Sequence, residues 1–202
     1  SSEVRSVIKS GLFHAELDER NLTEYFYYQA PIGTNTLVKG ISCLKAGHYG
    51  IIENGKFSEV PYWSYADAQP SNDDAATAKK KIKDLFLDSV RLRMISDVPF
   101  GAFLSGGIDS SLVVACMSEL SELPINTFHI SFAEKEFDES PFAEQIAKKY
   151  KTNHHSIVVR PEVFLESLDD ILAAMDSPSG DGPNTYLVSK YTKAGGIKVA
   201  LS

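Results

Sequence analysis

Two adjacent glycines between hydroxyl side chains and one carboxylate form the segment best suited to chemistry. The segment reads Ser105-Gly106-Gly107-Ile108-Asp109-Ser110-Ser111. It lies between the apolar runs 98–104 and 112–117, which predict a buried strand before the loop and a helix after it. Glycine lacks a Cβ, so the backbone can approach an anion, and the N–H groups that begin a helix attract negative charge. The segment therefore predicts a phosphate-binding loop whose three serines add hydroxyl donors.

The only carboxylate in this loop, Asp109, needs its own explanation because it would repel a phosphate. Mg²⁺ is commonly held by one or two carboxylates together with phosphate oxygens, which makes Asp109 a candidate magnesium ligand. The alternative is an ordinary glycine-rich turn in which Asp109 caps the following helix. A Walker A loop is excluded, because that loop needs a lysine before its Ser or Thr and none is present.

The chain beyond residue 72 alternates between helix-type and strand-type patterns. The expected strands are 98–104, 125–132, 154–159 and 197–201, and the expected helices are 72–95, 110–120, 140–150, 161–175 and 184–193. We expect Asn72 or Asp73 to cap the first helix. Its core-facing side is expected to carry Ile82, Leu85, Phe86, Ser89, Val90 and Met94. This alternation predicts an α/β fold with a parallel sheet covered by helices on both faces.

Ligands of parallel sheets bind outside the carboxyl ends of the strands. Three segments should lie at that edge, namely the loop 105–109, the loop 133–139 and whatever follows Ser202. His154 and His155 begin a strand, so only one of them can point to a given face, and we interpret both as structural.

A polar, proline-containing stretch, 64–74, divides the chain and predicts two domains, 1–66 and 72–202. The first piece contains Asn54-Gly55 between two strand-like runs, which predicts a hairpin with a type I′ turn. A single hairpin buries little apolar surface. We therefore expect this piece to be the β-rich tail of a larger domain.

The composition narrows the classes of protein. The 202 residues carry a net charge of -7, and the pI is near 5.2, which argues against a nucleic-acid partner. No apolar run approaches the length of a membrane span, and residues 1–5 lack the apolar stretch of a signal peptide. Two cysteines, Cys43 and Cys116, without metal-ligand spacing indicate a reducing compartment, so we expect a cytoplasmic protein without a membrane partner.

The Ser-Gly-Gly-x-Asp-Ser pattern resembles the PP-loop of the ATP-pyrophosphatase superfamily. The longer stretch 98–111 resembles the synthetase-domain signature of glutamine-dependent asparagine synthetases. Further stretches with this resemblance are 127–132, 137–140, 143–147, His154-His155 and 176–186. In the first piece, Ser2-Glu3-Val4-Arg5 resembles the end of the family's N-terminal nucleophile-type glutaminase domain, and 44–49 with Tyr62-Trp63 resembles its junction to the synthetase domain.

The resemblance implies an adenine nucleotide α-hydrolase-like fold with ATP and Mg²⁺ as cofactors. It implies a ligase that adenylates aspartate, so that ammonia derived from glutamine yields asparagine, AMP and pyrophosphate. The expected partners are therefore small molecules, and a homodimer is a candidate assembly. The stretch 178–186 is shorter than expected for the best-known asparagine synthetases, which leaves another carboxylate, such as a glycan acid, as an alternative acceptor.

The resemblance also implies roles for single residues. The pyrophosphate would be held by Ser105, Gly106, Gly107, Asp109 and Ser110, with Asp109 on Mg²⁺. Leu104 and Ile130 would flank the adenine, although buried strands are apolar in any case. Ser202 would begin the family's second nucleotide loop. Asp181 would face the acceptor or its ammonia as a catalytic residue, or else initiate the helix expected at Asn184.

The chain departs from the family pattern in two ways. The glutaminase of the family uses a cysteine at its mature N-terminus, whereas Ser1 here matches the far end of that domain and Cys43 is internal. The chain also stops where the second nucleotide loop should begin, so we expect it to be part of a longer protein. Two other classes stay open, a tRNA-modifying PP-loop enzyme and a nucleotide-binding module without turnover.

Overall fold

A computed structural model describes residues 1–132 and 138–202 of the chain. The chain forms two compact units, and each is described by itself. The first unit contains 1–72 together with 173–182, and the second contains 73–172 together with 183–202. Of the expected edge loop 133–139, residues 133–137 lie outside the described residues. The polar stretch near residue 72 thus separates the units, but the sequence did not predict that 173–182 groups with the first.

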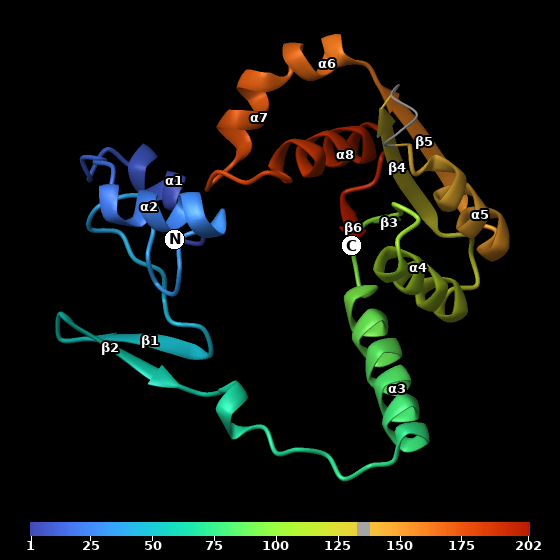
Figure 1. Ribbon diagram of the computed structural model, residues 1–202, viewed down its shortest axis with the longest axis horizontal. Coiled ribbons are helices and arrows are strands. Elements are labelled where there is room, and N and C mark those ends of the chain that lie inside the picture. Colours follow the sequence, from blue (N-terminus) through green and yellow to red (C-terminus); the bar gives the residue numbers. More distant parts are fainter. Residues whose placement is uncertain (133–137) are drawn as a thin grey trace. The chain divides into compact units, whose positions relative to one another are not determined.

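The second unit is built on a four-stranded parallel sheet (Figure 1). Its strands are β3 (Phe100–Phe103), β4 (Asn126–Phe132), β5 (Asn153–Val159) and β6 (Val199–Leu201). Their order is β5-β4-β3-β6, and every neighbouring pair is parallel. The predicted α/β class with a parallel sheet is confirmed.

Helices cover both faces of this sheet. The helices from α3 onward are α3 (Ala75–Arg93), α4 (Ile108–Leu120), α5 (Ser140–Tyr150), α6 (Pro161–Glu166), α7 (Leu168–Ala174) and α8 (Gly182–Ala194). Side chains of α3, α4 and α5 form one buried cluster with Ala102 and Leu104, whereas Val188 of α8 forms another with Phe128. Successive strand residues point to opposite faces, so these clusters lie on the two sides of the sheet.

The strand order creates a switch point beside β3. The chain moves outward from β3 to β4 and β5 and then returns to place β6 on the other side of β3. The strands that follow β3 in the chain therefore lie on both sides of it. Open α/β sheets bind ligands in the crevice at such a point, which is where the loop after β3 lies.

The first long helix differs from its prediction at both the cap and the buried face. Asp74, rather than Asn72 or Asp73, caps α3, because its carboxylate accepts a hydrogen bond from the Thr77 N–H at 2.7 Å. Of the predicted face, Ile82 and Leu85 are 66% and 71% exposed. The core cluster contacts only the C-terminal half of this helix, through Phe86, Leu87, Val90 and Met94.

The predicted helix 161–175 is interrupted at Ser167. Ser167 has φ -91° and ψ -2° and ends α6, and α7 begins at the next residue. Its side chain is buried, and the Lys190 ammonium of α8 donates to its hydroxyl at 3.2 Å. No proline or glycine marks this break, so helical periodicity alone could not predict it.

The first unit combines short helices with one hairpin. Its elements are α1 (Val4–Lys9), α2 (Glu19–Tyr28), β1 (His48–Glu53), β2 (Lys56–Pro61) and the 3₁₀ helix η1 (Tyr65–Asp67). Asn54 and Gly55 both have positive φ, 50° and 73°, between the two antiparallel strands. This geometry confirms the predicted type I′ turn.

A buried polar stripe runs along one face of β4. Thr127, His129 and Ser131 are all buried, and their neighbours Phe128 and Ile130 point to the opposite face. The Thr127 hydroxyl lies 2.9 Å from both the Thr152 hydroxyl and His154 Nδ1.

The adjacent histidines of β5 divide between the two faces. While His154 contacts this polar stripe, His155 stacks on the Phe128 ring with centroids 4.7 Å apart. The structural interpretation of the two histidines is therefore supported.

The histidines His129 of β4 and His154 of β5 predict a loss of stability in mild acid. Burial lowers the pKa values of His129 and His154 below 6.5, although the Leu104 carbonyl, Glu139 and Asp138 oppose the shift at His129 and Glu144 opposes it at His154. The unfolded chain then binds protons near pH 6.5 that the folded chain does not bind. We expect the free energy of unfolding to fall as the pH drops from about 7.5 to about 5.

Chemical denaturation across that range measures the effect. A His154→Gln variant should show a smaller slope, because the polar contact with Thr127 can be kept without a titrating ring. Carboxylates titrate mainly below this range, so they should contribute little to the slope. An unchanged slope in both His154→Gln and His129→Gln would contradict the assignment.

Candidate nucleotide-binding site

The loop between β3 and α4 presents helix N–H groups without a side-chain cap. α4 begins at Ile108, two residues earlier than expected, and Gly107 is its N-cap with no side-chain hydrogen bond. The first N–H groups of an α-helix have no partner within the helix. An anion at this position would receive hydrogen bonds and a favourable helix dipole.

Two serine hydroxyls hold the loop in this shape. Ser105 Oγ accepts a hydrogen bond from the Gly107 N–H at 3.3 Å and lies 3.0 Å from Ser110 Oγ. The Ser110 hydroxyl donates to the Gly107 carbonyl at 3.3 Å. The third serine differs, because the Ser111 hydroxyl is buried and has no partner within the described residues. Ser105 and Ser110 therefore fit the predicted role better than Ser111.

Gly106 is required by close packing as well as by its backbone conformation. Its φ is 85°, and a Cβ there would lie 2.6 Å from Phe142 Cβ and 2.7 Å from the Ala143 nitrogen. The loop therefore lies against the N-terminal turn of α5, and the close approach of Gly106 to an anion stays a prediction. At Gly107 a Cβ would meet only Ser105 Oγ, at 3.3 Å.

Asp109 extends into solvent from the first turn of α4, and no described side chain pairs with it. In residues 1–132 and 138–202, no group of three or more His, Cys, Asp or Glu side chains could hold a metal ion. A single free carboxylate beside an anion site fits Mg²⁺, which takes most of its other ligands from phosphates and water. It does not fit a metal that needs a complete protein cage.

Ser202 lies at the same edge of the sheet. Leu201 pairs with Ala102, so Ser202 comes next to the end of β3, from which the loop departs. It lines a hollow of about 500 Å³ whose other walls come from α3, α4 and β6. Ser202 therefore lies at the edge of the sheet from which the loop departs, and its role in a second nucleotide segment stays a prediction.

Leu104 and Ile130 lie on opposite faces of the sheet. Leu104 is 1% exposed in the core cluster beneath α4 and α5, whereas Ile130 packs with the cluster beneath α8. The side chain of Leu104 is therefore strand core, whereas Ile130 is only partly buried. A contact of either residue with adenine stays a prediction.

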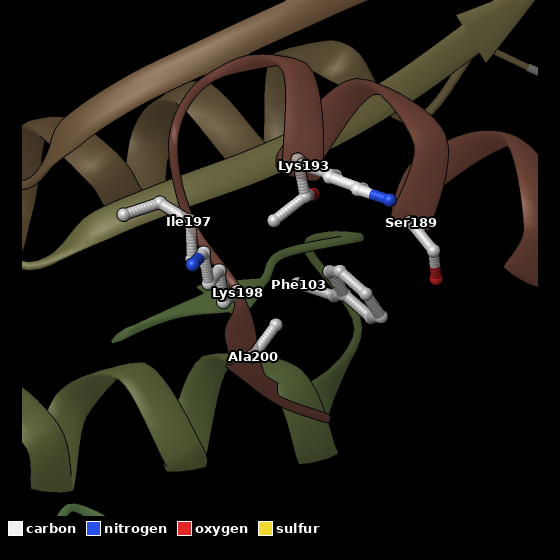
Figure 2. Close-up of a pocket in the computed structure, with 7 residues that line it drawn as sticks. Phe103, Ser189, Lys193, Ile197, Lys198 and Ala200 are labelled. Carbon is white, nitrogen blue, oxygen red and sulfur yellow. The ribbon is translucent and has the colours of Figure 1, made fainter. Parts of the chain in front are cut away.

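A second hollow, of about 730 Å³, lies on the α8 side of β6. Figure 2 shows Ser189 and Lys193 of α8, Phe103 of β3, Ile197 and Lys198 of the segment that leads into β6, and Ala200 of β6 itself. Of these residues, only Phe103 belongs to a stretch that the sequence analysis singled out, the signature 98–111. The two hollows leave both faces of the edge strand β6 open.

Asp181 belongs to the first unit and precedes α8. Its backbone N–H donates to Ser179 Oγ at 3.3 Å, and its side chain is exposed at the start of this helix. α8 begins at Gly182 rather than at Asn184, so the helix-initiating interpretation fits the local geometry. A catalytic role for Asp181 stays a prediction.

The chain is an α/β protein with an uncapped helix start at the carboxyl edge of a parallel sheet. The asparagine synthase family matches residues 81–202, more than half of the chain, so the chain belongs to that family. No helix in the described part of the chain has the length and apolar character needed to span a membrane.

Individual relatives agree with this assignment. The chain is 41% identical over 139 residues to a putative asparagine synthetase (glutamine-hydrolyzing) 2 of Methanocaldococcus jannaschii, covering 65% of this chain and 26% of the relative. It is 31% identical over 190 residues to asparagine synthetase (glutamine-hydrolyzing) 1 of Bacillus subtilis, covering 93% and 30%. The chain thus spans less than a third of these relatives' length.

Among solved structures, an NH3-dependent NAD synthetase from Campylobacter jejuni matches 63% of this chain and 56% of its own, with 16% identity and a TM-score of 0.39.

Substitution of Gly106 should impair both folding and nucleotide binding. We expect Gly106→Ala to destabilise the chain by about 2–5 kcal/mol, because a strained left-handed backbone and an overpacked contact with α5 add together. The matched control is Gly196→Ala, which has φ 84° but open space around its Cβ position. That variant should lose about 1–2 kcal/mol.

Thermal unfolding and MgATP titration check both variants. MgATP affinity should fall in Gly106→Ala and stay unchanged in Gly196→Ala. Equal destabilisation of the two would show that backbone conformation alone, and not packing against α5, requires glycine at position 106.

Proposed function

We propose that this chain carries the ATP site of an amide-forming ligase that adenylates a carboxylic acid for attack by ammonia. The observation that supports it is the uncapped N-terminus of α4, with the exposed carboxylate of Asp109 in its first turn and no partner for it in residues 1–132 and 138–202. Membership of the asparagine synthase family supports the same chemistry. Aspartate is the proposed acceptor, which gives asparagine.

The reaction has two steps that the loop can assist. A carboxylate oxygen of the acceptor attacks the α-phosphorus of ATP, and the bond to the β-phosphate breaks to release pyrophosphate. Ammonia then attacks the acyl carbonyl, and AMP leaves. Negative charge develops on the pyrophosphate, where the N–H groups of α4 and the hydroxyls of Ser105 and Ser110 would stabilise it.

Asp109 would hold Mg²⁺ against the phosphates. The ion supplies positive charge and orients the leaving group. The chain places the exposed carboxylate of Asp109 on the first turn of α4, beside the helix N–H groups. Ser202 and Asp181 are proposed to face the nucleotide and the acceptor, respectively. A cytoplasmic location and a homodimer stay predictions.

ATP–pyrophosphate exchange by the complete protein tests the proposal directly. Labelled pyrophosphate should enter ATP only in the presence of an acceptor acid, because the first step is reversible. A panel headed by aspartate, with glycan acids included, identifies the acceptor. Exchange with another acid alone would keep the mechanism but change the product. A folded protein that binds MgATP without exchange for any acid would refute the ligase and favour a binding module.

Replacement of Asp109 tests the magnesium assignment. Asp109→Ala should weaken MgATP binding by at least about tenfold, since even loss of an outer-shell partner of a metal ligand costs about that much. Asp88→Ala is the matched control, because Asp88 is an exposed acid of the same unit that pairs with Arg91 on α3. Calorimetric titration at several Mg²⁺ concentrations measures the effect. Unchanged Mg²⁺ dependence in Asp109→Ala would remove this residue from the site.

A further inference from the structure

Residues 173–182 pack with the first unit, although the chain immediately before and after them belongs to the second unit. This segment connects α7 with α8. It also carries Asp181, the candidate acceptor-facing residue. The contacts that hold this segment therefore determine which unit positions Asp181.

Asp176 supplies the cap that α1 lacks locally. The N-cap residue of α1, Glu3, makes no side-chain cap hydrogen bond. The carboxylate of Asp176 accepts instead from the Val4 N–H at 3.0 Å and from the Arg5 N–H at 2.8 Å. A carboxylate that binds two N–H groups at a helix N-terminus forms charge-assisted bonds with a favourable dipole.

Arg5 makes the reciprocal contact with the end of α7. Its guanidinium donates to the carbonyls of Ala173 at 3.0 Å and of Ala174 at 2.5 Å, where helix carbonyls have no partner of their own. Glu3 accepts from Arg5 Nε at 2.7 Å and orients the guanidinium. The start of α1 and the end of α7 thus complete each other's hydrogen bonds.

The loop between Asp176 and Asp181 is closed tightly at its base. A Cβ on Gly182 would overlap the Met175 sulfur, so the two ends of the loop pack directly together. Within the loop, the Gly182 N–H donates to the Ser179 carbonyl at 3.3 Å, and Ser179 Oγ accepts from the Asp181 N–H. Asp176 and Asp181 therefore flank the closed base of one short loop, so we expect a displacement of Asp176 to shift Asp181 as well.

We propose that Arg5 and Asp176 are positioning residues that hold the Asp181 loop on the first unit and so set the geometry of the acceptor site. This inference rests on the proposed ligase function. The ATP loop 104–110 lies in the second unit, and the described contacts of both positioning residues lie within the first. The two residues should therefore affect the acceptor and not the nucleotide.

The test uses exchange kinetics of the complete protein with Asp176→Ala and Arg5→Gln. We expect the KM for the acceptor acid to rise by about tenfold or more, because a small displacement of a substrate-positioning group can cost about 100-fold in rate. The KM for ATP should stay unchanged. The acceptor KM of the double variant should be little higher than that of either single variant, because both substitutions break the same contact between α1 and the end of α7.

Two further variants separate positioning from general stability. Asp176→Asn keeps one acceptor oxygen and should give an intermediate KM, and it replaces Asp176→Ala if that variant does not fold. Lys39→Ala removes an ion pair with Glu16 elsewhere in the first unit and should change neither KM.

Each outcome decides the inference. A selective rise in the acceptor KM, partly restored in Asp176→Asn, supports it. An unchanged acceptor KM, or an equal rise in both KM values, shows that the contact is only a structural cap and overturns it while the ligase stands. Absence of any acid-dependent exchange by the unsubstituted protein refutes the proposed function, and the inference with it.

Discussion

The parallel pairing of β3 with a strand on each side is the constraint on which the site depends. β4 continues beyond the end of β3, and the Leu104 N–H still donates to the Phe128 carbonyl at 2.8 Å. This bond extends the ladder to the residue before the loop. Since β6 pairs on the other side, the chain must turn away from the sheet at Ser105. The turn directs the start of α4 toward the switch point, where an anion can bind.

The glycines of the loop serve the fold and the site through different contacts. Gly106 lets the loop lie against the first turn of α5, and Gly107 leaves the start of α4 without a side-chain cap. A serine or aspartate at position 107 would satisfy the same N–H groups and occupy the place of a ligand. An uncapped helix is less stable, so the proposed site would keep its N–H groups available at some expense of local stability.

Local sequence patterns predicted most of the second unit, because strand alternation and helical periodicity are short-range signals. α5 was predicted with its observed bounds, and the turn at Asn54 and Gly55 follows from backbone preference alone. The interruption at Ser167 and the exposure of Ile82 depend on tertiary packing, which no window of sequence contains. The loop was recognisable for the same reason as the hairpin, since its residues are contiguous.

The contact between Arg5 and the end of α7 could not be predicted from local sequence patterns. Arg5 and Asp176 are 171 positions apart, and each resembles an ordinary surface charge until the fold brings them together. Both lie in stretches that resemble the family, yet a single sequence contains no signal that pairs them. A domain boundary drawn along the sequence therefore separates Asp181 from the helix that holds its loop. The start of α1 and the end of α7 supply each other's missing hydrogen-bond partners. The N-terminal part of the chain therefore helps to hold the candidate acceptor loop, which lies far from it in sequence.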